Sequence, residues 1–600
     1  MKGLRGRAIA LALLVAAAPL AMCGPANADP TIDQLLPRLL AEHGIPGAAV
    51  AIVSAGRPAE IKGYGYADAE RKIPVDASRT AFSTASLAKT FTAAAALQLV
   101  QEGRLSLDKD VNTYLTGFRI PDTFPGHPIT LRHLLTHTAG FESDVIGTSW
   151  SSPAAAEPLK TVVREGLPER ARPPGTVLSY DNYAYDLAGY LVETVSGRPY
   201  GDYVREQILD PLDMTGTSFA APLPAGTQVA RGYGGTGAFA HYYGHPASGT
   251  GPVTTAADMA TFMKALLDDD PRLGRGVAAL MKTRQYAQDP RLPGMGYGLE
   301  ESTRNGHRVL YKGGDVNGFH HLMTLLPDQR AGVYVVFNGE DSLPASAYDL
   351  IDAVVDRSFP GSPPQSPPTG GDTSAYEGTY VSVQPRGDLL RFAALFDHVT
   401  VQATGDGRLT TDGLSRDGST QRWRQVGPGL FAEDGGQELI AFDSGGLLAG
   451  GHREEATTFE RAPVTWHVWM LYLGLTAFLA ALLGVPVAAL LRRPARHRAA
   501  WWLAWLTSAL VAVFVYGLAT TIIIAPTDAI LLGSPLLTGA LLASSAAFTL
   551  TAGLVVCTGA AWWKGWWSLP GRLSYTAFTA AAICFMIVAY LYNLVGGVFA

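Results

Sequence analysis

The carboxyl-terminal part of this 600-residue chain is almost free of charge, and this constrains the fold more than any other feature. Residues 466–600 contain six Lys or Arg residues and one acidic residue, Asp528. Four apolar stretches fill this part, at about 466–491, 500–525, 536–561 and 574–599, and each is long enough to cross a bilayer as a helix. Backbone polar groups in lipid must be satisfied within the segment, so the sequence predicts four transmembrane helices in residues 463–600.

The loops between these stretches predict their orientation. Four arginines lie between residues 492 and 498, and Lys564 and Arg572 lie in the last loop, whereas residues 526–535 contain no basic residue. Basic loops tend to stay in the cytoplasm, so the chain ahead of residue 466 is expected on the outer side.

Residues 1–28 predict the same orientation independently. A basic start leads into an apolar run over residues 8–21 and a small-residue exit at 26–28, which is typical of a secretory signal peptide. One alternative is a lipoprotein site at Cys23, which the bulky Met22 before it disfavours. The other is a retained helix, for which the apolar run is short.

The membrane part is interpreted as an anchor. Its four stretches place no Asp, Glu, Lys or Arg at depth, which leaves no obvious group to relay a proton or coordinate an ion. A transporter or channel is therefore disfavoured. Gly539 and Ala543, four residues apart, are expected to let two helices approach closely.

The rest of the chain divides into three parts. Residues 29–358 mix strand and helix patterns and predict an α+β domain. Residues 359–374 hold five prolines with glycine and serine, which is typical of a linker. Residues 375–462 show short β-rich runs separated by Gly/Asp turns, which predict a small antiparallel all-β domain of at most nine strands.

Charge and cysteine content exclude some functions of the outer part. Without the tail (+5) and the first 28 residues (+3), the overall net charge of −6 becomes −14 for residues 29–465. An acidic body repels phosphate backbones, so nucleic acid is not an expected partner. Cys23, Cys557 and Cys584 all lie outside this part, which therefore has neither a disulfide nor a thiolate metal site.

Within residues 29–358, strand patterns and helix patterns occupy different places. Apolar strand-like runs stand near the two ends, at 48–53, 309–311, 321–326 and 332–337. Helical patterns stand between them, at 86–101, 184–195 and 256–267. This arrangement predicts one antiparallel sheet built from both ends, with a helical region inserted.

The first element that can carry chemistry is Ser86-Leu87-Ala88-Lys89, at the start of an alanine-rich helical pattern. Positions i and i+3 share a helix face, so the Ser86 hydroxyl and the Lys89 amine can meet. A neutral lysine, which burial and a second cation would favour, can take the hydroxyl proton and create a nucleophile. The N–H groups at a helix start also attract a developing oxyanion. Alone, Ser-x-x-Lys is weak evidence for catalysis, because a serine that caps a helix, followed by a solvated lysine, explains the pattern more often.

The second element is Tyr180-Asp181-Asn182, which follows a Pro-Pro-Gly turn and precedes a helical pattern. A loop there can present the phenol and the amide side by side. Tyr180 could pass a proton to a leaving group, and Asn182 could bond both Lys89 and a substrate amide. The alternative is an aromatic packing residue followed by an Asn helix cap.

The third element is Lys312-Gly313-Gly314, expected at the end of a strand over residues 308–311. Glycines beside a strand end let a substrate backbone lie close, as an added strand would. The charge of Lys312 can bind a carboxylate and disfavour the charged form of Lys89. The alternative is an exposed strand lysine before a turn.

In this order, and about 90 and 130 residues apart, the three elements resemble the serine β-lactamase and penicillin-binding-protein superfamily. Within it the chain is most similar to the class C β-lactamase-like group, which also contains DD-peptidases, D-aminopeptidases and esterases. Residues 130–140, 210–214 and 249–263 match the same group. The resemblance covers residues 32–357 and implies a β-lactamase/DD-peptidase-like antiparallel sheet with a helical subdomain.

The resemblance also implies acyl transfer. Ser86 would attack a carbonyl, Lys89 and Tyr180 would move protons, and water would later release the acyl group. The oxyanion would lie between the backbone N–H groups of Ser86 and Asp315. The residues expected to bind substrate are Asn182, Lys312, Gly313 and Gly314.

Two positions depart from the pattern of the group. Gly313 stands where a hydroxyl is usual, which removes a carboxylate contact, and Lys312 stands where relatives often have His. Both departures concern the substrate rather than the mechanism.

The sequence thus predicts an exported, membrane-anchored serine hydrolase that acts on a small-molecule or peptide substrate beside membrane lipid. The expected substrates are cell-wall peptides ending in D-amino acids, β-lactams or esters. The alternative from another class is a receptor that is acylated without turnover and signals through the helices. No cofactor is expected, no third metal ligand accompanies His133 and His137, and the oligomeric state stays open.

Overall fold

The computed structural model describes most of the chain between residues 32 and 595, and the expected signal peptide at 1–28 lies outside the described residues. The described ranges are 32–142, 147–235, 237–340, 343–362, 367–383, 398–405, 407–443, 445–450, 458–462, 497–524 and 531–595.

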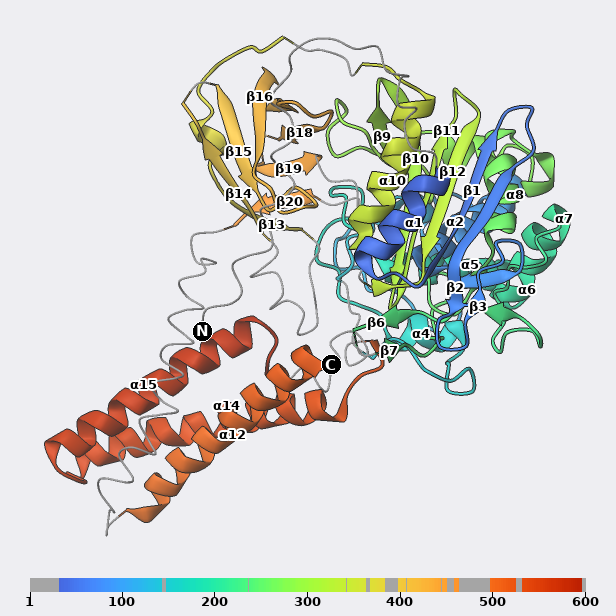
Figure 1. The fold of residues 1–600 in the computed structure, drawn as a ribbon. Coiled ribbons are helices and arrows are strands. Elements are labelled where there is room, and N and C mark those ends of the chain that lie inside the picture. The colour runs from blue at the N-terminus through green and yellow to red at the C-terminus, as the bar shows by residue number, and fades with distance from the viewer. Residues whose placement is uncertain are drawn as a thin grey trace.

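The body folds around a seven-stranded antiparallel sheet (Figure 1). In sheet order the strands are β3 (Ile73–Pro74), β2 (Glu60–Asp68), β1 (Gly47–Ser54), β12 (Ala331–Phe337), β11 (Phe319–Leu326), β10 (His307–Val316) and β9 (Glu300–Arg304). Because β1 pairs with β12, strands from the two ends of the body meet inside the sheet. This confirms the prediction of one antiparallel sheet built from both ends.

Helices cover both faces of this sheet. α1 (Ile32–His43) and α10 (Leu343–Ser358) pack on one face, and α8 (Ala256–Leu267) packs on the other, with α2 (Ala88–Gln101) in the same core (Figure 1). Alternate residues of β1 point into the two apolar cores, as the pleat of a strand requires.

The helical region lies between β3 and β9. Its remaining helices are α3 (Leu131–Leu135), α4 (Leu159–Glu165), α5 (Asn182–Ser196), α6 (Tyr200–Val204), α7 (Asp210–Leu212) and α9 (Val277–Lys282), with 3₁₀ or π turns at Ala85–Leu87, Val111–Thr113, Arg205–Leu209 and Pro271–Leu273. Its short strands are β4 (Thr80–Ser83), β5 (Gln228–Val229), β6 (Tyr233–Gly234), β7 (Gly237–Ala238) and β8 (Val253–Thr254). α2 is buried on all sides, because its alanines let neighbours such as α5 approach closely.

Eight described strands between residues 378 and 461 form a closed antiparallel barrel, preceded by a 3₁₀ turn at Ser374–Tyr376. Its strands are β13 (Gly378–Ser382), β14 (His398–Ala403), β15 (Arg408–Asp412), β16 (Gln421–Gly427), β17 (Leu430–Glu433), β18 (Leu439–Phe442), β19 (Leu447–Gly450) and β20 (Thr458–Arg461). Side chains such as Trp423, Phe431 and Phe459 fill the interior. The predicted all-β part is confirmed, and pairing of β13 with β20 removes its open edges.

The barrel contacts the rim of the body next to β9. Leu292 packs against Ala441 and Ala449 of the barrel. The amides of Asn305 and Gln437 bond each other, with Gln437 Nε2 donating to Asn305 Oδ1 at 3.0 Å.

Three described helices are long and apolar enough to cross a membrane: α12 (Arg498–Ile524), α14 (Pro535–Trp563) and α15 (Leu569–Leu591). They correspond to three of the four predicted stretches, and the other stretch, 466–491, lies outside the described residues. α15 begins earlier than the apolar run suggests, because Pro570 suits the first turn of a helix.

The close helix contact in the membrane part differs from the predicted one. A Cβ on Gly517 of α12 would lie 2.8 Å from the Cβ of Ala540 on α14. Within the described part of the chain, nothing lies within 4 Å of the corresponding point at Gly539. The contact between α12 and α14 therefore runs through Gly517 and Ala540, whereas a contact of Gly539 with the first predicted stretch, 466–491, lies outside the described residues and stays a prediction.

Candidate active site

Ser86 lies where two separate segments of the helical region meet. It occupies the 3₁₀ turn Ala85–Leu87, Lys89 lies in the first turn of α2, and Tyr180 precedes α5. Lys89 Nζ donates a hydrogen bond to Ser86 Oγ at 2.9 Å, and the Tyr180 hydroxyl donates to the same oxygen at 2.7 Å. Lys89 is fully buried and Tyr180 nearly so. The structure therefore brings together the hydroxyl, the amine and the phenol singled out in the sequence.

The backbone around Ser86 is held in an unusual conformation. Ala85 has a φ of +46°, in the left-handed region that non-glycine residues rarely adopt. Two glycines allow the close packing that holds it: a Cβ on Gly249 would lie 2.9 Å from the Ala85 carbonyl carbon, and one on Gly314 would lie 3.0 Å from Ser86 N. Backbone strain of this kind is common next to the reactive groups of functional sites.

Lys89 has a second hydrogen-bond acceptor that the sequence did not suggest. Its Nζ donates to the backbone carbonyl of Ser248 at 2.5 Å. The predicted bond between Lys89 and Asn182 stays a prediction. Asn182 is the first residue of α5 and is half-buried beside the capping Asp181, so the helix start fixes its position.

Behind Ser248 lies a buried carboxylate–imidazole pair. Asp186 of α5 accepts a hydrogen bond from the Ser248 hydroxyl at 3.0 Å, and its carboxylate lies 2.6 Å from His245 Nδ1. Burial opposes a charged imidazole, but the Asp186 carboxylate outweighs this effect and raises the pKa of His245. This pair supports the chain segment whose carbonyl accepts from Lys89.

Lys312 lies within β10 rather than at the end of a strand. β10 continues to Val316, because Lys312 to Val316 stay paired with β11. The Lys312 side chain is buried, its Nζ lies 4.6 Å from the centre of the Tyr180 ring, and it forms an ion pair with Glu300 Oε1 at 2.8 Å. The predicted second cation therefore lies near Tyr180, but Glu300, which the sequence did not reveal, balances its charge.

The edge of β10 is open next to the nucleophile. β9 pairs with β10 only as far as Tyr311, so among the described residues the strand edge beyond it has no partner strand in the sheet. Gly314 on this edge approaches the Ser86 backbone. The expected oxyanion position between the N–H groups of Ser86 and Asp315 is compatible with this approach and stays a prediction.

Asp181 and His137 hold Tyr180 in place. The His137 ring stacks at 4.5 Å from the Tyr180 ring, and its Nδ1 accepts the backbone N–H of Asp181 at 3.1 Å. Burial, with Lys312 and Lys89 nearby, holds the pKa of His137 well below its usual value, so the ring is neutral. Burial also raises the pKa of Asp181 to about 7, although its carboxylate accepts the Ala184 N–H as the cap of α5.

The two histidines considered as metal ligands have separate structural partners. His133 Nδ1 accepts the backbone N–H of Thr130 in the capping box of α3. His137 packs on Tyr180 as described above. In the described part of the chain, no group of three His, Cys, Asp or Glu side chains is placed to hold a metal ion.

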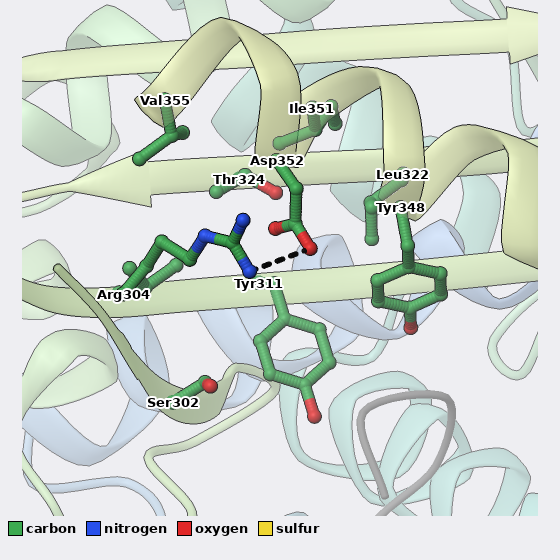
Figure 2. A pocket seen from close by; sticks show the side chains of 10 residues that line it. Ser302, Arg304, Tyr311, Leu322, Thr324, Tyr348, Ile351, Asp352 and Val355 are labelled. Atoms are coloured by element: carbon green, nitrogen blue, oxygen red, sulfur yellow. Dashed lines mark hydrogen bonds and ion pairs between the residues drawn. The ribbon is translucent and has the colours of Figure 1, made fainter. Parts of the chain in front are cut away.

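A separate small pocket lies on the opposite face of the sheet from Ser86, between β9, β10, β11 and α10 (Figure 2). Tyr311 and Tyr348 line it, together with an ion pair of 3.2 Å between Arg304 and Asp352. It contains none of the candidate catalytic residues.

Comparisons with known proteins agree with this geometry. A family model described as Beta-lactamase matches residues 32–355, more than half of the chain. Protein flp of Staphylococcus aureus (strain MRSA252) is 35% identical over 189 residues, which are 31% of this chain and 38% of that protein. The putative penicillin-binding protein PbpX of Bacillus subtilis (strain 168) is 35% identical over 191 residues, 32% of this chain and 46% of that protein.

Each match spans less than half of the curated relative, so it concerns the shared domain rather than the whole protein. The crystal structure of SurE with D-Leu has the same fold, with a TM-score of 0.50 and 22% identity over 72% of this chain and 98% of that one. With a serine, a lysine and a tyrosine converging beside a glycine-containing sheet edge, and a family model that matches the entire body, the chain belongs to the beta-lactamase family of serine hydrolases.

Proposed function

We propose that this chain is an exported, membrane-anchored hydrolase that forms an acyl-enzyme on Ser86. The observation that carries the proposal is the convergence of Lys89 Nζ and the Tyr180 hydroxyl on Ser86 Oγ, at 2.9 and 2.7 Å. Both groups are buried, so their protons are shared with the serine rather than with bulk water.

In the first half of the reaction, Ser86 Oγ attacks the carbonyl carbon of the substrate. A neutral Lys89 takes the hydroxyl proton as the Oγ–C bond forms, and the backbone N–H groups of Ser86 and Asp315 stabilise the oxyanion. The bond from the carbonyl carbon to the leaving group then breaks, Tyr180 gives its proton to the leaving atom, and the proton held by Lys89 restores the phenol. Water cleaves the acyl-enzyme by the same steps in reverse.

We propose that residues along the edge of β10 position the substrate. An extended substrate chain would lie along this edge, as in strand addition, with Lys312 nearby at 4.6 Å from the centre of the Tyr180 ring. Asn182, half-buried at the start of α5, is the proposed partner of a substrate amide. Peptides with D-amino acids, β-lactams and esters all contain the carbonyl that this site attacks, and one relative carries the name putative penicillin-binding protein.

The proposed location follows from the apolar helices and the flanking charges. α12, α14 and α15 are each long enough to span a bilayer, and the basic loops around them favour a cytoplasmic position. The body and the barrel would then lie outside, where wall precursors are accessible.

Covalent labelling of the full-length protein in detergent with a fluorophosphonate probe tests the proposal. Intact-protein mass spectrometry should show one adduct on the wild type and none on Ser86→Ala. Ser78→Ala, a change at an exposed serine just ahead of β4, is the matched control and should label normally. Lys89→Met should slow labelling by about 10²–10⁴-fold, the usual contribution of a positioned base. An adduct that persists in Ser86→Ala would remove the basis of the assignment.

A further inference from the structure

A buried ion pair stands beside the reacting groups. Lys312 Nζ and Glu300 Oε1 lie 2.8 Å apart, and the two side chains are 3% and 2% exposed. Glu300 is the first residue of β9 and is the register partner of Tyr311, next to Lys312 on β10. Within the described part of the chain, the other Glu300 oxygen is buried without a hydrogen-bond partner, so this carboxylate depends on Lys312.

This pair removes the positive charge that an anionic substrate would require. A substrate carboxylate at Lys312 would have to share the ammonium with Glu300 and would lie next to a second buried negative charge. Like charges in such a poorly solvated site repel strongly, and a buried ion pair resists the loss of either partner. A neutral substrate group meets no such penalty.

Neighbouring positions on β10 add no positive charge beside Lys312. Gly313 offers no hydroxyl to a carboxylate. Asp315, whose carboxylate lies 2.6 Å from His320 Nδ1, alternates along the strand with Gly314 and so points to the face away from the nucleophile. Among these strand positions, the Lys312–Glu300 pair therefore sets the charge balance beside Ser86.

The positive charge of Arg416, on the other face of the sheet, does not change the balance of charge beside Ser86. Arg416, from the connection between β15 and β16, stacks 3.9 Å from the centre of the Tyr348 ring. The Tyr348 hydroxyl lies 3.4 Å from the Cβ position of Gly313, whereas the Cβ position of Gly314 faces Ser86. Successive strand residues point to opposite faces, so Arg416 lies on the side of the sheet away from the nucleophile.

We propose that Glu300 is a specificity-determining residue that neutralises Lys312 and adapts the site to acyl donors without a carboxylate beside the scissile bond. The substrates are then esters and amides with uncharged leaving groups, in preference to β-lactams and to peptides with a free carboxyl terminus. This inference rests on the proposed serine hydrolase function and narrows its substrate class. Ser86 Oγ still replaces the leaving group, which departs with the proton that the serine gave up.

A matched pair of thioesters with one N-acyl-D-alanyl group tests this proposal on the full-length protein in detergent. One thioester carries a thioglycolate leaving group with a carboxylate, and the other carries the uncharged thioglycolamide. Wild type should prefer the amide form in kcat/KM by at least about tenfold, as expected when like charges are brought together. Glu300→Gln, which frees the Lys312 charge, should shift this ratio towards the carboxylate form by at least about tenfold.

Two further variants control for effects on folding. Glu301→Gln removes the adjacent carboxylate of β9, which pairs with Arg284 and Arg308, and should leave the substrate ratio within about twofold. Glu300→Gln/Lys312→Gln removes both charges together and should retain the wild-type preference, because no net charge is created. A wild type that prefers the carboxylate thioester would overturn the proposal, whether or not Glu300→Gln folds. An unchanged ratio in a folded, active Glu300→Gln would do so as well.

Acylation rates distinguish a failure of the proposed role of Glu300 from a failure of the proposed serine hydrolase function. Intact-protein mass spectrometry can follow Ser86 adducts from a neutral phenyl ester and from benzylpenicillin, which carries a carboxylate, even where deacylation is slow. Faster acylation by the neutral ester, reversed in Glu300→Gln, supports the role of Glu300. Adducts at Ser86 that form faster with benzylpenicillin in wild type contradict that role and leave the serine hydrolase intact. No adduct with either reagent or with a fluorophosphonate contradicts the proposed function itself.

Discussion

At the scale of single residues, the site combines groups that a local pattern reveals with groups that it hides. Ser86 and Lys89 meet because they lie three positions apart, about one turn, and this spacing is visible in the sequence. Glu300 and Ser248 reach the same site from distant segments, and nothing in their own surroundings marks them. The feature of the sequence that could have pointed to Glu300 is Lys312, since a buried cation requires a partner of opposite charge.

Asp181 gives a prediction for pH dependence. The folded protein raises the pKa of this carboxyl from 3.8 to about 7, chiefly through burial, so folding favours the protonated form. Ionisation therefore costs stability increasingly as the pH rises from about 4 to about 7. Asp181→Asn keeps a good helix cap without this cost, so its melting temperature should exceed that of wild type by at least about 2 °C at pH 8 and by less at pH 5.

Thermal unfolding at the two pH values measures this difference. Asp328→Asn, at an exposed turn between β11 and β12, is the control and should give the same small change at both values. An Asp181→Asn variant that loses stability at pH 8 would show that the charged form of Asp181 is needed in the fold.

At the scale of elements, the site depends on how closely β10 approaches the turn that carries Ser86. An open strand edge and the 3₁₀ turn that carries Ser86 come together because Gly314 has no side chain. From its periodicity the sequence predicted α5 and the strands β1, β10, β11 and β12 of the sheet, but not β2, β3 or β9. It did not predict that β10 extends through Lys312 to Val316, because that extension depends on pairing with β11.

Gly314→Ala should disrupt this approach. The added Cβ would lie 3.0 Å from Ser86 N, Leu87 N and the Thr84 carbonyl oxygen, which are backbone atoms that cannot move aside easily. A displacement of the strand should lower the acylation rate of Ser86 by at least about 100-fold, the typical effect of misplacing reacting groups by one ångström. Gly313→Ala, whose Cβ would lie 3.4 Å from the Tyr348 hydroxyl and 3.8 Å from the His321 carbonyl oxygen, should cost much less. Fluorophosphonate labelling rates compare the two, and equal losses would contradict the packing argument.

At the scale of the whole molecule, a beta-lactamase-family body, a closed barrel and apolar helices share one chain. The barrel lies against the body through Leu292 and the amides of Asn305 and Gln437. The sequence predicted a small antiparallel β domain but not its closure, since alternation along each strand does not show whether the first and last strands pair.

The membrane orientation is tested by cysteine labelling. In a background without Cys557 and Cys584, Asp528→Cys should react with a membrane-impermeant maleimide on intact spheroplasts. Lys564→Cys should react only after permeabilisation, because the positive-inside tendency holds its loop in the cytoplasm. The reverse pattern would place the body in the cytoplasm and contradict the proposed location.

The sequence by itself determined what depends on neighbours along the chain: the apolar spans, the strand and helix periods, and the Ser86–Lys89 pair within one turn. Only the tertiary structure decided the contacts between residues that lie far apart in the sequence. This includes the Lys312–Glu300 pair, the Ser248 carbonyl at Lys89, the closure of the barrel and the contact of Gly517 with α14. The physical reason is that each of these contacts joins separately folded segments, whose mutual placement follows from the packing of the whole core.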